Sequence, residues 1–308
     1  MDKGRTGILH NLSKDIKINK YVYIMFFPIF LYYAIFQYIP MGGIVVAFLD
    51  YHPFRGIAGS RWVGFHNFID FLTGPFAWRT IRNTLILNSY DILFVFPAPI
   101  ILALLLNEVR ALNYKRVVQT ISYMPHFISL VVICGMIVDF SAPNGLFNRI
   151  ITILGGTSSA LLTRAELYRT IYISSDIWSG IGWGSIIYLA SLSGVDMNLY
   201  EAAVMDGAGR FKQMLHVTIP AIIPTIAILL IMRLGTIMSL GFAKTILIYN
   251  PLVYETSDIV SSFVYRRGLV EQNYGLGAAV GLFNSVINII TLILANRLSR
   301  IVTRESLW

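Results

Sequence analysis

The chain has 308 residues, of which 56% are hydrophobic and only 13% are charged. Soluble domains carry roughly 25% charged residues, so this composition excludes an ordinary soluble domain and indicates an integral membrane protein. The net charge of +8 fits basic residues that flank membrane spans, so we expect membrane lipid and no nucleic acid as a partner. A single cysteine, Cys134, excludes an intrachain disulfide, and no Cys/His spacing predicts a metal site.

Six apolar stretches predict six transmembrane helices and an all-α integral membrane fold. Each is long enough to cross about 30 Å of hydrocarbon, and a helix satisfies its own backbone groups there. The predicted spans cover residues 21–39, 83–106, 117–140, 169–195, 220–246 and 277–297. The first resembles a signal peptide, but its apolar run is long and no cleavage site follows, so we expect it to remain as a span. Residues 21–300 then form the membrane domain.

Basic residues predict the orientation of the spans. Thirteen lysines and arginines fall in residues 1–20, the loops 107–116 and 196–219, and the C-terminal end of the chain from residue 297 on. Ten others, Lys244 among them, are assigned to the opposite side. Because basic residues concentrate on the cytoplasmic side, we predict that segment 1–20, tail 301–308 and loop 196–219 are cytoplasmic.

The loop 197–219 predicts an elbow that projects from the membrane. Residues 201–205 are mostly good helix formers, and Gly207 permits a turn that a Cβ would resist. A second short apolar stripe follows in residues 211–215, and Pro220 suits the first turn of the next span. We expect two short helices joined at a glycine. The plainer alternative is an ordinary solvated loop.

Arg233 is the most costly residue to expose to lipid, at roughly 2.5–3.5 kcal/mol on insertion scales. It should therefore face the protein interior or a water-filled path. Asp91, Asp139 and Asp176 are candidate counter-charges, and the sequence does not choose between them. Both a structural ion pair and a substrate contact remain open.

Other polar residues in the spans predict a lined path for a solute. Small residues in segment 174–185 let helices approach closely, and aromatic faces beside hydroxyl and carboxylate groups suit a carbohydrate. The candidate path residues are Asn88, Asp91, Asp176, Trp178, Arg233, Asn284 and Asn288. Packing and interhelical hydrogen bonds explain several of them nearly as well. No catalytic set and no phosphate-binding loop is visible, so we expect no active site, no metal and no cofactor in this chain.

The spacing of the elbow resembles the EAA loop of ABC importer permeases. Glu-Ala-Ala at residues 201–203 is followed by three residues, Gly207, nine residues, and then Val-Thr-Ile-Pro at 217–220. Segment 62–68 is similar to one found after the first span of sugar-importer permeases, and segment 200–208 is similar to their carbohydrate branch. Asn83-Thr84, segment 122–127 and the ending 305–308 extend the resemblance, the last two toward a subgroup that handles oligosaccharides.

This resemblance implies the maltose-importer type of fold, the type I ABC importer permease, in a bacterial cell membrane. It implies a heterodimer with a second homologous permease, two ATPase subunits that bind ATP and Mg²⁺, and an extracytoplasmic sugar-binding protein that delivers an oligosaccharide. The residues implied in coupling to the ATPase are Glu201, Ala202, Ala203, Asp206 and Gly207.

Two other functions stay open at this point. The same machine could carry a peptide or a polyamine, although the two sugar-type segments argue against it. A membrane enzyme or sensor would need a convergent catalytic set or a soluble signalling domain, and the sequence shows neither. Arg233 and the outer arginines also raise the hypothesis of an acidic, uronate-containing sugar.

Overall fold

The computed structural model describes residues 15, 17–239, 241–302, 306 and 307. Most of the predicted segments 1–20 and 301–308 lies outside the described residues. The described chain is helical apart from a small antiparallel hairpin, in which β1 (Leu49–Asp50) pairs with β2 (Arg61–Trp62). The predicted all-α class is therefore confirmed, with this hairpin as a minor addition.

Within the part of the chain that the structure describes, five helical segments are long and apolar enough to cross a membrane, judged by length and composition. They are Lys20–Phe48, Ala77–Glu108, Leu130–Ile153, Arg210–Leu234 and Tyr274–Ile301. The predicted fourth span is helix α11 (Ala165–Ser193), which has 29 residues. Its glycine, serine and aspartate residues make it less apolar than the other five, which fits a helix whose faces meet protein or water rather than lipid.

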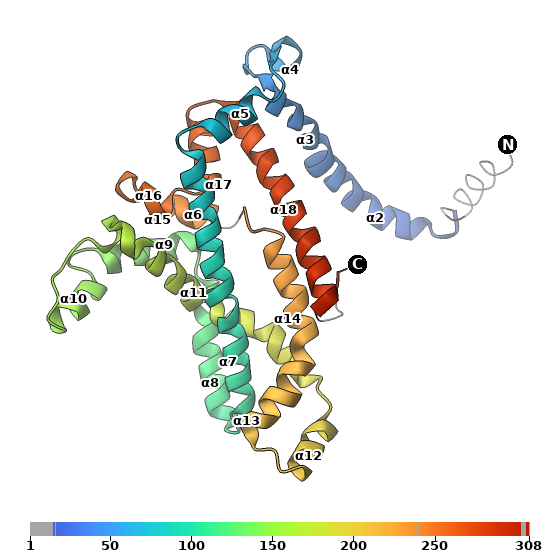
Figure 1. Cartoon of the computed structure of the whole chain (residues 1–308). Helices are drawn as coiled ribbons and strands as arrows, with labels where there is room; N and C mark the ends of the chain where they lie inside the picture. The colour runs from blue at the N-terminus through green and yellow to red at the C-terminus, as the bar shows by residue number, and fades with distance from the viewer. Residues whose placement is uncertain (1–14, 16, 240, 303–305, 308) are drawn as a thin grey trace.

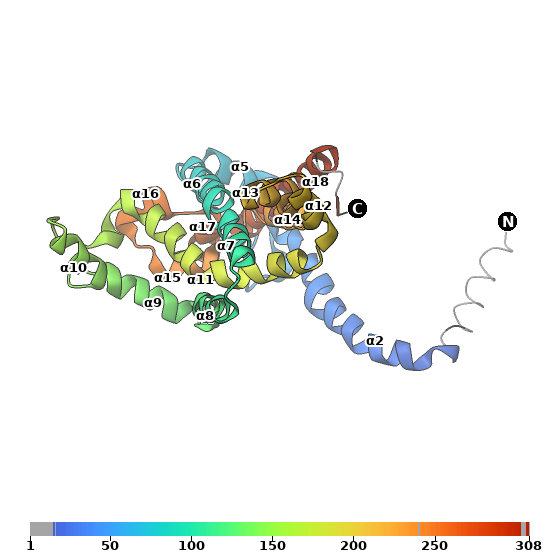
Figure 2. The same cartoon turned by 90° about the horizontal axis from the view of Figure 1, so that it is seen from below.

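The first span stands apart from the rest of the chain except at its last element, residues 42–48, which packs against the C-terminal helix Tyr274–Val302. It runs through α2 (Lys20–Tyr33), η1 (Ala34–Tyr38), α3 (Ile39–Met41) and η2 (Gly42–Phe48). Figure 2 shows α2 extending to one side of the molecule, opposite α10. Its most apolar window has no buried residue, so its side chains are left for contacts outside this chain.

The other long helices form an elongated bundle. Its members are α6 (Ala77–Tyr90), η3 (Asp91–Val95), α7 (Pro97–Glu108), α11, α14 (Ile219–Leu234) and α18 (Tyr274–Val302). Figure 1 shows α4 (Gly56–Gly59) and α5 (His66–Thr73) at one end, and α12 (Met197–Met205) and α13 (Arg210–Gln213) at the opposite end. The bundle thus separates α4 and α5 from the predicted elbow.

The predicted third span, 117–140, is wrong as a single helix. The chain forms α8 (Leu112–Tyr123), the short turn η4 (Met124–Phe127) and α9 (Leu130–Ser141), followed by α10 (Leu146–Ile153). Pro125 offers no backbone N–H, and Ile128 is extended. Ser129 then caps α9 by accepting the Val132 N–H, so a new helix starts there.

The predicted fifth span, 220–246, is also interrupted. Helix α14 ends at Leu234, and the chain turns before α15 (Phe242–Ile248). Gly241 precedes α15 with a φ of 83°, in the left-handed region that favours glycine. The remaining elements are η5 (Leu161–Thr163), η6 (Met214–Thr218), η7 (Pro251–Val253), α16 (Tyr254–Ser257), α17 (Val260–Phe263) and η8 (Val264–Val270).

Helix α11 approaches α8 and η4 so closely that only glycine fits at one position. A Cβ built at Gly182 would collide with the backbone of Ser122 and Tyr123, whereas a Cβ at Gly180 on the same helix would meet nothing within 4 Å. The small residues of this helix therefore serve packing at Gly182, as membrane helix interfaces often require.

We predict that Gly182→Ala lowers the free energy of unfolding by about 1–3 kcal/mol, the usual cost of overpacking. The matched control, Gly180→Ala, should be neutral or slightly stabilising, because alanine is the better helix former. Thermal unfolding of both variants in detergent checks this. Equal midpoints for the two variants would contradict the close contact.

Candidate translocation and coupling sites

Two adjoining cavities lie between the helices of the bundle. The first, of about 280 Å³, is lined from α6, η3, α11 and the segment that follows α14. The second, of about 520 Å³, is lined from η3, α7, α11 and α14. Asp176 and Arg233 line both cavities, so these two charged side chains mark the point where the cavities meet.

Arg233 pairs with Asp91 across the bundle. Its Nε and Nη2 donate to the two carboxylate oxygens of Asp91, at 2.6 and 2.5 Å. The arginine side chain keeps 37% of its exposure and the aspartate only 10%. Of the three predicted counter-charges, Asp91 is thus the partner of Arg233. Asp139 is exposed, and Asp176 has another partner. Such a two-pronged pair holds the guanidinium in one orientation.

Asp176 pairs with Lys244, which the loop count assigned to the outer side. That assignment is wrong, because Lys244 is 5% exposed and lies against α11. Its ammonium donates to the Tyr172 carbonyl, the Ser175 hydroxyl and Asp176, at 2.7, 2.8 and 2.7 Å. All three ammonium hydrogens are therefore used, and this lysine is held in place. Its position in the apolar segment 242–248 is the signal that sequence reasoning missed.

The two ion pairs leave Arg233 as the more accessible cation of the cavity. Two acids and two bases balance in charge, which lowers the cost of placing them inside a membrane bundle. Asn88 adds a polar wall: its amide donates to the Thr84 carbonyl, and its buried Oδ1 has no partner among the described residues. A cation beside an unused acceptor can contact both the carboxylate and the hydroxyl groups of a solute.

Three predicted path residues lie elsewhere. Trp178 lines a separate, largely apolar cavity of about 430 Å³ with residues of α9 and α10. Asn288 accepts from the Met238 N–H and donates to Ser239, so it fastens the turn after α14 to α18. Asn284 is 8% exposed and lines neither charged cavity. The packing explanation fits Asn288, whereas the roles predicted for Trp178 and Asn284 stay predictions.

The elbow has the predicted form of two short helices joined at a glycine. Helix α12 ends with Gly207 at a φ of 77°, and the Ala208 and Gly207 N–H groups donate to the carbonyls of Ala203 and Val204, both at 2.9 Å. This is a Schellman ending, which requires a left-handed residue at the Gly207 position. Helix α13 then begins at Arg210.

The solvent-exposed surface of the elbow carries both apolar and charged side chains. Glu201 and Asp206 are exposed, and so are large apolar side chains nearby: Val204 at 58%, Met205 at 87% and Phe211 at 71%. Such a patch on a short projecting hairpin is typical of a surface that another protein covers.

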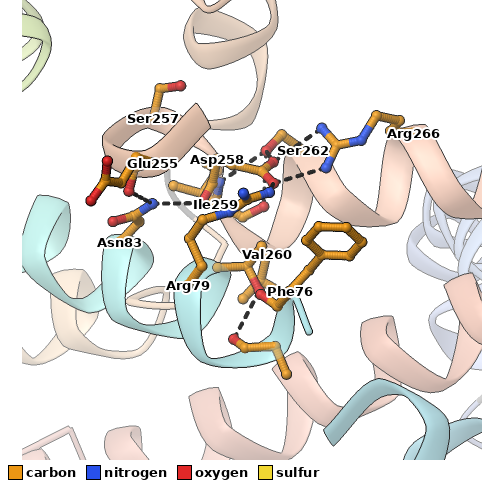
Figure 3. Close-up of polar contacts among 12 residues, drawn as sticks. Phe76, Arg79, Asn83, Glu255, Ser257, Asp258, Ile259, Val260, Ser262 and Arg266 are labelled. Carbon is orange, nitrogen blue, oxygen red and sulfur yellow. Dashed lines mark hydrogen bonds and ion pairs between the residues drawn. The ribbon is translucent and has the colours of Figure 1, made fainter. Parts of the chain in front are cut away.

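A third cluster of charged residues joins α6 to the segment 255–266 around Asp258, which is fully buried (Figure 3). Arg79 of α6 donates to it at 3.0 Å, Arg266 of η8 at 2.8 and 3.1 Å, and Ser262 at 2.9 Å. Burial lowers the pKa of the Arg266 guanidinium, but its hydrogen bonds to Asp258 and the charge of that carboxylate outweigh burial and raise the pKa. This carboxylate is a structural anchor with no free oxygen to offer a solute.

Among the described residues, no group of His, Cys, Asp and Glu side chains is arranged to hold a metal ion. The clustered acids Asp91, Asp176 and Asp258 pair with arginine or lysine instead. The described residues thus form two lined cavities and a projecting hairpin.

Comparison with protein families identifies the class. A family described as binding-protein-dependent transport system inner membrane component matches residues 71–304. The chain belongs to this family, so it is a membrane-embedded permease subunit of an ABC importer and not a catalytic subunit. The predicted family is thereby confirmed.

Two proteins of Bacillus subtilis (strain 168) are similar over most of the chain. Protein LplB is 45% identical over 294 residues, which covers 95% of this chain and 92% of LplB. The polygalacturonan/rhamnogalacturonan transport system permease protein YteP is 43% identical over 290 residues, which covers 94% of this chain and 90% of YteP.

Two crystal structures share the fold. One is a bacterial ABC transporter involved in the import of the acidic polysaccharide alginate, with a TM-score of 0.89 and 41% identity over 95% of this chain and 99% of that chain. The other is a bacterial alginate ABC transporter in complex with an alginate pentasaccharide-bound periplasmic protein, with a TM-score of 0.90 and 41% identity over 96% of this chain and 99% of that chain. The type I importer permease fold is confirmed.

We predict that Asp258→Asn lowers the free energy of unfolding by about 3–5 kcal/mol, because it leaves two guanidinium groups facing a neutral amide. Glu271→Gln is the control, since its ion pair with Arg267 is exposed and should contribute at most about 0.5 kcal/mol. Thermal unfolding in detergent compares them. A similar small loss for both would show that Asp258 is no anchor.

Proposed function

We propose that this permease carries acidic oligosaccharides, delivered by an extracytoplasmic binding protein, through the cavity that Arg233 lines. The observation that carries the proposal is this arginine, fixed by Asp91 and 37% exposed at the junction of two cavities. A carboxylate on a sugar ring can approach a guanidinium held in this way and share its donors. Asn88, whose Oδ1 has no partner among the described residues, lines the same cavity as a polar group.

The named substrates of similar proteins support an acidic sugar. YteP is named for polygalacturonan and rhamnogalacturonan, and the two similar structures are of alginate transporters. These names favour a sugar over a peptide or a polyamine. A polyamine would also be repelled by an accessible arginine.

The proposed assembly contains a second homologous permease, two ATPase subunits and the binding protein. Both termini and the elbow would lie in the cytoplasm, in agreement with the basic residues of those segments. The unburied first span and the exposed elbow give this chain surfaces for such neighbours.

Coupling would pass through the elbow to α14. The Tyr200 hydroxyl and the Thr218 hydroxyl lie 2.9 Å apart, which joins α12 to the start of α14. Arg233 lies near the other end of that helix, which is 16 residues long. When the ATPase dimer closes, a push on α12 and α13 would move α14 as a unit and with it the wall of the cavity. Glu201 and Asp206 would supply exposed charge for the contact with the ATPase. The small side chains of Ala202 and Ala203 would let the ATPase approach the hairpin closely.

We predict that Gly207→Val uncouples the importer. A left-handed β-branched residue costs roughly 1–2 kcal/mol or more, so the elbow should leave its docking shape and uptake per ATP hydrolysed should fall about tenfold. Gly209→Val is the matched control, because Gly209 has a φ of −69° and open space around it. Uptake and ATPase activity of the reconstituted complex measure the ratio. An unchanged ratio for Gly207→Val would exclude this role of the elbow.

The substrate proposal predicts that ATPase activity of the complex rises with a uronate oligomer on its binding protein, and about tenfold less with a neutral oligomer of equal length. The double variant Arg233→Gln/Asp91→Asn keeps the cavity neutral and should lose most uronate uptake. Asp91→Asn alone keeps the cation and should retain uptake. Full uronate uptake by the double variant, or equal stimulation by neutral sugar, would refute the proposal.

A further inference from the structure

A second group of arginines lies outward of the Arg233 cavity, around the Asp258 anchor. Four arginines from three elements gather there: Arg79 and Arg82 of α6, Arg169 of α11 and Arg266 of η8. They face two carboxylates, those of Asp258 and Glu255. The Asp258 carboxylate already accepts hydrogen bonds from Arg79 and Arg266. The cluster therefore carries more positive than negative charge.

Arg82 and Arg169 hold the unbalanced charge. Arg82 Nη2 donates to the backbone carbonyl of Glu255 at 3.2 Å, and Arg169 Nη2 donates to Asn83 Oδ1 at 2.8 Å. Neither takes part in any of the ion pairs found among the described residues. The Nε groups of both are buried and have no partner in that part of the chain.

The same framework positions both side chains. Asn83 is fully buried, and its amide donates to the carbonyls of Glu255 and Asp258 at 2.8 and 3.1 Å (Figure 3). Its remaining oxygen receives Arg169, and the Glu255 carbonyl receives Arg82. One asparagine and one carbonyl thus bring arginines of α6 and α11 together before any ligand arrives.

The two arginines lie near each other, because Arg82 donates to the Glu255 carbonyl and Arg169 to Asn83, whose own amide donates to that same carbonyl. Two partly buried like charges without carboxylate partners are unfavourable until an anion binds. Glu255 is exposed and makes no ion pair among the described residues, so it leaves the guanidinium groups available.

We infer that Arg82 and Arg169 form an anion-binding site for a carboxylate of the incoming oligosaccharide, outward of the Arg233 cavity. This inference rests on the proposed function, because it concerns the same acidic solute. Arg169 lies seven residues before Asp176 on α11, or about 10 Å at 1.5 Å per residue. A chain of several sugars, and not a single sugar, can therefore contact both stations, so the two sites together select for acidic chains.

The test uses the full complex in nanodiscs of zwitterionic lipid. For Arg82→Gln/Arg169→Gln, the KM for uptake of uronate oligomers should rise about tenfold and lose most of its dependence on salt, since screened charge attraction is removed. Arg82→Lys/Arg169→Lys keeps the charge and should restore most of the affinity. Arg149→Gln, an exposed arginine on α10, should behave as wild type.

The outcomes separate the two proposals. A wild-type complex that takes up no uronate oligomer would refute the proposed function. If the wild-type complex takes up the uronate oligomer and the folded Arg82→Gln/Arg169→Gln variant has an unchanged KM, only the outer site is overturned. A phosphate head group offers the same anionic chemistry, so a variant effect that appears only after anionic lipid is added would assign the site to lipid and overturn the sugar inference. Thermal unfolding shows whether each variant is folded.

Discussion

The structure depends on ion pairs between its segments, because a charge inside a membrane bundle is costly unless a partner neutralises it. Asp258 satisfies Arg79 and Arg266, Asp91 satisfies Arg233, and Asp176 satisfies Lys244. The pairs of Arg79 with Asp258, Arg233 with Asp91 and Lys244 with Asp176 join residues 179, 142 and 68 positions apart, so pairing fixes how the helices are arranged. The pairs differ in how exposed they are: the Asp258 carboxylate is fully buried, whereas the Arg233 side chain keeps part of its surface exposed to a cavity. This difference separates an anchor from a site.

The cavity exists because the helices around it are interrupted. Helix α14 ends at Leu234, and the chain returns at Gly241 beside the hydroxyl of Tyr172 before α15 carries Lys244 to α11. A π-helical turn begins at Asp91, where backbone irregularity places the carboxylate toward Arg233. Irregular backbone at this depth is tolerated where it lines a cavity or is covered by protein. The breaks in the spans thus make room for the two cavities.

The sequence predicted the helical class, the elbow with its glycine and the presence of a buried partner for Arg233. These follow from local rules: hydropathy, turn chemistry and the cost of an exposed charge. It did not predict which aspartate pairs with Arg233, because the partner is 142 positions away. It treated 117–140 and 220–246 as unbroken, since hydropathy windows average over Pro125 and Gly235. Lys244 was missed because a short apolar segment after a glycine resembles the end of a span.

The central claim is that an acidic oligosaccharide passes beside Arg233. The direct measurement places a single cysteine at Ala243, which lines the first cavity, in a Cys134→Ala background. A small water-soluble thiol reagent should label this cysteine. A uronate oligomer, delivered by the binding protein during ATP turnover, should slow the labelling. A control cysteine at Ile153, which is 83% exposed on α10, should be labelled at the same rate with and without the oligomer. If no uronate oligomer slows the labelling at position 243, the account is contradicted.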